Sequence, residues 1–321
     1  MKKRDPKAVR LLSAVIGCTL FLQLLYSPFF SQFVSAVATP ELISMLLFLG
    51  TGRSAEPAEP VPETTAPEAL PEKITFSDAD ADALTFTNKI GAVFDVRELL
   101  LQPLDWSLRS EEPTVLIYHT HTTESYENTE NYKESSSYRT LDSKYNMLSI
   151  GSHLAERLEE AGIHVIHATN IHDHPDYNSA YSRSKQTVAD YMAQYPSIRL
   201  VLDLHRDAYE DGQGNQATNT VPVGQSRASK LMFLVGTDIA SGDHPGWRDN
   251  MALAVKLQAL MERQVAGVCR PITLRSAAFN QFLSPGALLV EVGTAGDTRQ
   301  NALAAADILA DAIIALAQGS Q

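Results

Sequence analysis

The chain has 321 residues, 44% of them hydrophobic, and a formal net charge of −12. This length suffices for one domain of about 200 residues with a large core, together with further segments. The negative charge argues against binding to nucleic acid and against docking onto an anionic lipid surface. The two cysteines, Cys18 and Cys269, lie in different predicted segments, which excludes a disulfide within the domain and a cysteine metal site.

The first 30 residues have the pattern of a membrane anchor. Residues 1–10 contain five basic residues and one acidic residue, and residues 11–30 contain no charge. A basic flank before about 20 apolar residues predicts a transmembrane helix at 11–30 with a cytoplasmic tail at 1–10. A cleaved signal peptide is the alternative, because Ser35-Ala-Val-Ala38 offers a small-residue cleavage site, but the apolar run is long for that purpose. Either reading places the rest of the chain outside the cytoplasm, and the anchor predicts a single-pass protein of the cell membrane.

Residues 31–73 are predicted to form a juxtamembrane segment and an acidic, proline-rich linker. The apolar stretch 42–49 is too short to span a bilayer and is expected at its surface. Residues 54–72 contain five glutamates, five prolines and no basic residue. Proline stiffens a chain and like charges extend it, so this segment is expected to act as a spacer, with an acidic docking motif as the alternative.

Residues 74–112 are predicted to be an ordered approach segment without an assigned role, and residues 113–321 to form the main domain. In this domain strand-like and helix-like patterns alternate. The expected strands are 114–119, 164–167, 198–204, 231–235 and 286–292, and the expected helices are 143–161, 179–194, 247–264 and 300–317. The alternation predicts an α/β fold with a mostly parallel sheet and helices on both faces.

Three of the predicted strands finish in side chains that bind metals or accept protons. The first leads into His119, His121 and Glu124, the second ends at His205, and the third reaches Glu291. A histidine and a glutamate three residues apart can face one cation if the backbone turns helically after the strand. The carboxyl ends of parallel strands meet at one edge of a sheet, so these residues predict a metal site there.

Five segments together resemble a known family: Ile117–Tyr126, Asp176–Ser184, Leu202–Asp207, Phe279–Gln281 and Ala287–Thr294. They are similar to the SpoIIP family of peptidoglycan amidases and endopeptidases, whose catalytic domain is similar to the zinc-dependent N-acetylmuramoyl-L-alanine amidases. One departure is the segment Gly296–Asn301, where the family usually carries an Asn-Thr pair and an acidic residue. It affects the loop expected on the substrate side and not the metal ligands.

The resemblance implies a zinc amidase-like fold and hydrolysis of the amide bond between N-acetylmuramic acid and L-alanine. It also implies cleavage of peptide cross-links and a role in engulfment during sporulation, with a SpoIID-like lytic transglycosylase and other engulfment proteins as partners. A zinc endopeptidase that acts only on wall peptides is the alternative with the same chemistry. A non-catalytic peptidoglycan-binding module or tether is the alternative from another class.

Residues of the motifs are given roles on this basis. His121, Glu124 and His205 are the expected zinc ligands, and Glu291 is the expected general base that takes a proton from water activated by the metal. Either Asp203 or Asp207 is expected to fix the tautomer of a metal-bound imidazole. Less direct contacts to ligands or substrate are expected from His119, Tyr177, Tyr181, Arg183, Arg206 and Asp207, with the two arginines as candidates to stabilise an oxyanion.

Overall fold

The computed structural model describes residues 74–127, 138–238 and 244–319. The predicted cytoplasmic tail, the anchor at 11–30 and the linker at 31–73 lie outside the described residues. The described residues all belong to one compact unit.

The domain is built on a seven-stranded sheet with the order β1-β8-β7-β9-β4-β2-β3. All neighbouring pairs are parallel except β7 with β9, which is antiparallel. The prediction of a mostly parallel sheet is confirmed, and the antiparallel pair is an addition that the strand patterns did not indicate. The strands are β1 (Phe86–Thr87), β2 (Val115–Tyr118), β3 (Val165–His167), β4 (Leu200–Asp207), β7 (Leu231–Gly236), β8 (Ile272–Arg275) and β9 (Ala287–Thr294).

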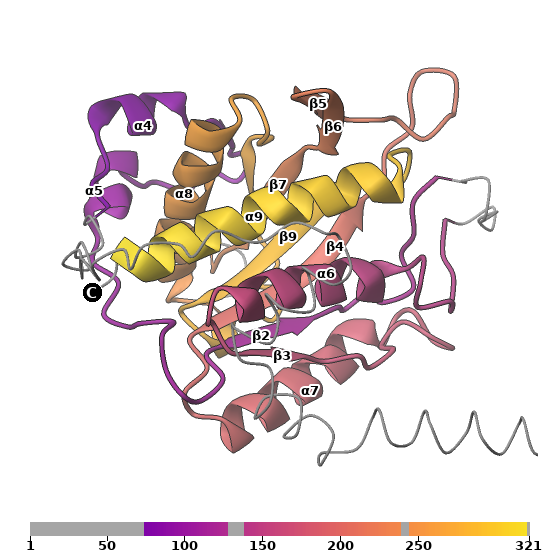
Figure 1. Ribbon diagram of the computed structural model, residues 1–321, viewed down its shortest axis with the longest axis horizontal. Helices are drawn as coiled ribbons and strands as arrows, with labels where there is room; N and C mark the ends of the chain where they lie inside the picture. The colour runs from indigo at the N-terminus through magenta and orange to yellow at the C-terminus, as the bar shows by residue number, and fades with distance from the viewer. Residues whose placement is uncertain (1–73, 128–137, 239–243, 320–321) are drawn as a thin grey trace, which may run out of the picture. The chain divides into compact units, whose positions relative to one another are not determined.

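Helices cover both faces of the sheet, as expected. Figure 1 shows α6 (Met147–Glu160), α8 (Trp247–Gln264) and α9 (Arg299–Gly319) together over one face. The other face is covered by α7 (Ala180–Gln194). Alternate residues of the strands point to opposite faces of the sheet. Ile117 and Leu204 lie in the large core beneath α6, α8 and α9. Leu116 and Val201 lie in a smaller core with Val188 of α7.

Three element boundaries differ from the sequence-based expectation for local reasons. Helix α6 begins at Met147, not near 143, because the Asn146 side chain accepts a hydrogen bond from Leu148 N at 3.0 Å and caps the helix there. Strands β4 and β9 continue past their expected ends because each is paired with the other along this stretch. His205 and Glu291 therefore lie inside paired strands and opposite one another in register.

Residues 74–112 belong to the same compact unit as the rest of the domain. They contribute α4 (Asp78–Ala83), β1 and α5 (Val96–Leu101), and β1 pairs with β8 as the edge of the sheet. A separate hairpin of β5 (Thr220–Val223) and β6 (Ser226–Ser229) follows β4, and a short 3-10 helix, η1 (Gln281–Leu283), precedes β9. The approach segment is therefore a part of the fold and extends its sheet.

Within the described ranges, α9 is the one helix whose length and apolar composition would allow it to cross a membrane. More than half of its most apolar stretch, 56%, is buried in the domain. Its buried residues, from Ala302 to Ala317, pack in the core together with α6 and α8. This core position accounts for its apolar composition.

Gly286 allows β9 to approach β4 closely, because a Cβ atom at this position would lie 1.9 Å from the carbonyl oxygen of Arg199. We expect Gly286→Ala to lower the free energy of unfolding by about 1–3 kcal/mol or more, since a backbone atom of the neighbouring strand would have to move. Gly212→Ala is the matched control, because its Cβ would meet nothing within 4 Å. Denaturant titration that finds the two variants equally stable would contradict this account of the β4–β9 approach.

Candidate metal centre

Three of the residues selected from the sequence converge at the carboxyl ends of β2 and β4. His121 and Glu124 lie in the turn that follows β2, which is closed by a backbone hydrogen bond from Glu124 N to His121 O at 3.2 Å. Nδ1 of His121 lies 3.5 Å from Oε1 of Glu124, and Nδ1 of His205 lies 3.5 Å from Oε2 of the same carboxylate. One candidate ligand atom from each residue lies within 4.8 Å of the other two.

These separations fit a bound cation better than they fit hydrogen bonds. Two ligands bonded to zinc at about 2.0–2.1 Å with a tetrahedral angle stand about 3.3 Å apart. A contact of 3.5 Å between ring nitrogen and carboxylate oxygen is long for a hydrogen bond. Two histidines and one glutamate are also a protein ligand set of catalytic zinc sites that keep a further position open. The donors present therefore fit zinc in kind, and the two separations from Glu124 are close to the spacing that zinc requires.

Asp203 stands behind His205. Its Oδ1 atom lies 3.0 Å from Nε2 of His205, although this contact does not have the geometry of a hydrogen bond. Asp207 lies beyond an irregularity in the β4–β9 pairing and forms an ion pair with Arg270 at 2.7 Å. Of the two aspartates considered for fixing the imidazole, Asp203 is thus the one in contact with it.

Glu291 lies beside His205 on the neighbouring strand. The two residues are in register in the parallel β4–β9 pair, so their side chains project on the same face of the sheet. Among the described residues, no hydrogen-bond partner is found for the buried Oε2 atom of Glu291. Burial raises the pKa of Glu291 to about 8, and the nearby Glu124 carboxylate adds to this effect. A nearby divalent cation would act in the opposite direction.

The charges within the candidate ligand set also favour a cation. Burial by itself would raise the pKa of Glu124, but the side chains of His121 and His205 hold it well below its ordinary value. Burial would lower the pKa of His205, but Asp203 and Glu124 raise it well above its ordinary value. The two carboxylates thus stabilise positive charge at the His205 ring, whether it is carried by a proton or by a metal ion.

Two tyrosines from the start of α7 and the segment before it pack against His121. The ring of Tyr177 stacks on the imidazole with centroids 4.5 Å apart, and Tyr181 meets it edge-on at 5.6 Å. Tyr177 is 48% exposed, so it forms part of the surface around the candidate centre. Both residues therefore lie where a substrate contact was expected.

Arg139 is a member of this site that the sequence did not indicate. Its guanidinium group bonds to Asp173 Oδ2 at 2.7 Å and to Glu124 Oε1 at 3.2 Å, and it lies 4.7 Å from the centre of the Tyr177 ring. Asp173 in turn accepts hydrogen bonds from the backbone and the hydroxyl of Thr123. Arg139 follows a polar stretch with no periodic pattern, and only its backbone bridge with Glu124 brings it here.

The two arginines that were expected to stabilise an oxyanion donate hydrogen bonds to main-chain carbonyl groups. The buried Arg206 donates to Glu124 Oε2 through its main-chain N–H at 3.1 Å, and its guanidinium bonds to the carbonyls of Ser125 and Tyr138. Arg183 donates to the carbonyls of His172 and Asp176. Arg206 supports the candidate ligand Glu124, whereas Arg183 fastens the loop before α7.

His119 is buried in the core of the domain. It is fully buried, with Nδ1 3.1 Å from Leu204 O and Nε2 2.9 Å from Nε2 of His167, and both rings pack over Gly151 of α6. The alternation of side chains along β2 places it on the face opposite to α7. His119 was expected to contact either a metal ligand or the substrate, and its burial favours the first of these alternatives.

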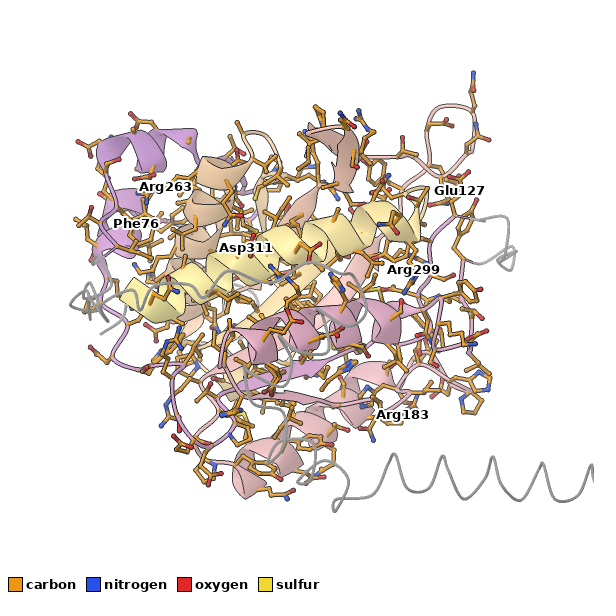
Figure 2. The ribbon with its side chains drawn as sticks, in the orientation of Figure 1. Phe76, Glu127, Arg183, Arg263, Arg299 and Asp311 are labelled. Carbon is orange, nitrogen blue, oxygen red and sulfur yellow. The ribbon has the colours of Figure 1, made fainter. Side chains whose placement is uncertain are left out.

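Figure 2 shows the edge of the domain to which these residues belong. The labelled residues Glu127, just after the β2 turn, and Arg183, near the start of α7, lie at the opposite end of the molecule from Phe76 and Arg263. The approach segment and the candidate centre are therefore at different ends of the domain.

The chain is similar to known proteins in sequence. The family model described as Stage II sporulation protein P (SpoIIP) matches residues 54–314. The Stage II sporulation protein P of Bacillus subtilis (strain 168) is 27% identical over 212 residues, which are 63% of this chain and 50% of that protein. The chain thus spans about half the length of this curated relative.

Solved structures with partial similarity include two N-acetylmuramoyl-L-alanine amidases. The AmiC2 enzyme of Nostoc punctiforme is 14% identical, with a TM-score of 0.36, over 64% of this chain and 94% of that chain. The enzyme from Clostridium difficile 630 is 18% identical, with a TM-score of 0.37, over 64% of this chain and 94% of that chain.

Replacing Arg139 tests its part in holding the site together. We expect Arg139→Met to lower the free energy of unfolding by about 1–3 kcal/mol, because it leaves the buried carboxylates of Asp173 and Glu124 without this partner. The matched control is Arg97→Met, since Arg97 also bridges two carboxylates, Asp78 and Asp82, but at an exposed position. Denaturant titration should find the control unchanged, and equal effects of the two substitutions would refute the expectation.

Proposed function

Because the chain belongs to the SpoIIP (stage II sporulation protein P) family, we propose that it is a zinc-dependent peptidoglycan hydrolase that cleaves the N-acetylmuramoyl-L-alanine amide bond. We further propose that it cleaves peptide cross-links, since these bonds are amides as well and one centre can serve both. The substrate and the cleaved bond belong to this proposal and rest on the motif resemblance together with the geometry of the site.

The observation that carries the proposal is the convergence of His121, Glu124 and His205 within 4.8 Å, with Glu291 in register beside His205. A site that only grips a polymer has no need of a buried carboxylate next to a metal-binding set. A tether between membrane and wall needs no metal-binding set at all. The arrangement therefore favours hydrolysis over the two non-catalytic alternatives.

In the proposed mechanism, His121, Glu124 and His205 would hold the zinc ion. A zinc ion there supplies positive charge that polarises an amide carbonyl and makes a nearby water molecule more acidic. Glu291 accepts the proton of the attacking water at its carboxylate and then delivers it to the leaving nitrogen. Asp203 orients the His205 ring, and the exposed face of Tyr177 contacts the bound chain.

The biological setting is proposed from family membership. The protein would act in engulfment during sporulation, next to a SpoIID-like lytic transglycosylase and other engulfment proteins. The amidase would release the stem peptides and the transglycosylase would cut the glycan strands, so the two activities complement each other on one polymer.

The decisive experiment is digestion of purified peptidoglycan, with the released ends identified by mass spectrometry. We expect free stem peptides that begin with L-alanine, loss of activity after treatment with a chelator, and recovery on addition of zinc. Products cut only within peptides would indicate the endopeptidase alternative. A protein that binds the polymer and zinc but releases nothing would indicate the binding module, and a protein without zinc would refute the hydrolase proposal.

Glu291→Gln tests whether Glu291 is the proton acceptor or a metal ligand. We expect this variant to keep its zinc and its fold and to lose about 10²- to 10⁴-fold in the rate of cleavage, which is the usual contribution of a general base. Zinc content and cleavage rate should be measured on the same preparation. Cleavage at the parental rate would exclude Glu291 as the base, and loss of zinc would make it a ligand instead.

Membrane attachment is a separate part of the proposal. We propose that residues 11–30 span the membrane and that residues 31–73 carry the domain outward, since a 19-residue spacer at about 3.1 Å per residue extends up to roughly 60 Å. We expect the full-length protein to resist extraction by carbonate and to dissolve in detergent. A mature protein that begins near residue 39 and appears free in the medium would show a cleaved signal peptide.

A further inference from the structure

A buried chain of polar groups runs from a turn before β9 to the candidate ligand His205. Asn280 donates through Nδ2 to Ser184 Oγ at 3.1 Å, and the Ser184 hydroxyl lies 2.8 Å from Oγ1 of Thr120. Thr120 Oγ1 donates to Asp203 Oδ2 at 2.6 Å, and Asp203 Oδ1 lies 3.0 Å from Nε2 of His205. All five residues are at least nine-tenths buried. Water therefore does not compete for these contacts.

The chemistry of the groups favours one direction for the protons in this chain. A carboxylate only accepts, so the single hydroxyl proton of Thr120 points to Asp203. The Thr120 oxygen can then accept the proton of Ser184, which also has the carbonyl of Tyr181 at 3.2 Å as an acceptor, and the Ser184 oxygen accepts from Asn280. The orientation of the Asn280 amide is fixed independently, because Nδ2 also donates at 2.9 Å to the carbonyl of Tyr181, which can only accept.

The turn that supplies Asn280 has an unusual backbone. Phe279 and Asn280 have φ angles of +48° and +59°, in the left-handed region. Asparagine tolerates this region, but a bulky residue such as phenylalanine rarely adopts it, so the surrounding structure must hold the turn in place. Gln281 does so, because its side chain bonds to Gly236 N at 2.8 Å and to Leu234 O at 2.7 Å at the end of β7.

We propose that Asn280, Ser184 and Thr120 are positioning residues that act through Asp203 to keep the Nε2 atom of His205 as a proton donor and its Nδ1 atom free for the metal. Thr120 donates to Asp203 through both its main-chain N–H and its hydroxyl, and these bonds hold the carboxylate beside the His205 ring. Asp203 Oδ1 lies 3.0 Å from Nε2, and on the other side of the ring Nδ1 faces Glu124 and the cation position. The inference rests on the proposed zinc site and adds to it a set of residues that touch neither metal nor substrate.

Ser184→Ala tests this chain of hydrogen bonds with little structural disturbance, because alanine favours the helix and the substitution removes only the hydroxyl. Ser182→Ala is the matched control, since Ser182 is an exposed serine of the same helix. Zinc affinity of the full-length chain is measured by competition with a chelator, and the protein is also loaded with Co²⁺, whose visible absorption reports the ligand geometry. Asp203→Asn is the reference, with an expected loss in zinc affinity of about 10- to 100-fold.

We expect Ser184→Ala to weaken zinc binding by about 3- to 10-fold, as for the loss of one hydrogen bond, and to shift the Co²⁺ spectrum in the direction of Asp203→Asn. Asn280→Asp keeps the size and tolerance of the turn but replaces the donor by an acceptor, so it should weaken zinc binding in the same direction. If Ser184→Ala has the same zinc affinity and Co²⁺ spectrum as Ser182→Ala, the positioning role is refuted. Zinc binding by the parent protein would still support the proposed site in that case. A parent protein that binds no zinc would overturn both.

Discussion

Burial of charge at the β4–β9 pair is the constraint on which the rest of this site depends. His205 and Glu291 stand side by side in the interior of a sheet, where an uncompensated charge is costly. Asp203 and Glu124 place negative charge on either side of the His205 ring. In the resulting cluster, Oε2 of Glu291 and Nε2 of His205 are buried without a hydrogen-bond partner among the described residues. A cation is the group that such a cluster stabilises best.

The surroundings of Glu124 follow from the same constraint. Its two oxygens are held separately, one by the guanidinium of Arg139 and the other by the main-chain N–H of Arg206. Arg206 is itself held by carbonyls of the segment after β2, and Arg139 by Asp173. Two loops and strand β4, which are distant in sequence, thereby fix one carboxylate. Such support keeps a candidate ligand in place before any metal arrives.

The sequence predicted the parts of this structure that depend on local pattern. Apolar strands that end in His121, His205 and Glu291 indicated both the parallel sheet and the meeting of these residues at one edge. The antiparallel pairing of β7 with β9 could not be predicted, because the side-chain period is the same for either strand direction. Strands β1 and β8 are short and were missed for lack of a pattern.

The choice between Asp203 and Asp207 could not be made from the sequence, because Arg270, which forms an ion pair with Asp207, lies far away along the chain. Arg139 was missed because loop residues carry no periodic signal, and only tertiary contacts bring it to Glu124.

The edge strand β1 determines how the approach segment would respond to tension. If the chain is held at its amino end while the opposite end of the domain grips a wall polymer, tension enters the fold next to Ile74. It is met there by two residue pairs between β1 and β8, by the ion pair of Arg263 with Asp80, and by hydrogen bonds from Arg263 to Thr75 O and from Lys256 to Leu99 O. The central strands β4 and β9, which carry the candidate centre, lie farther along the sheet and are joined over a much longer register. Under such tension the edge strand would separate before β4 and β9, and the candidate centre would keep its shape.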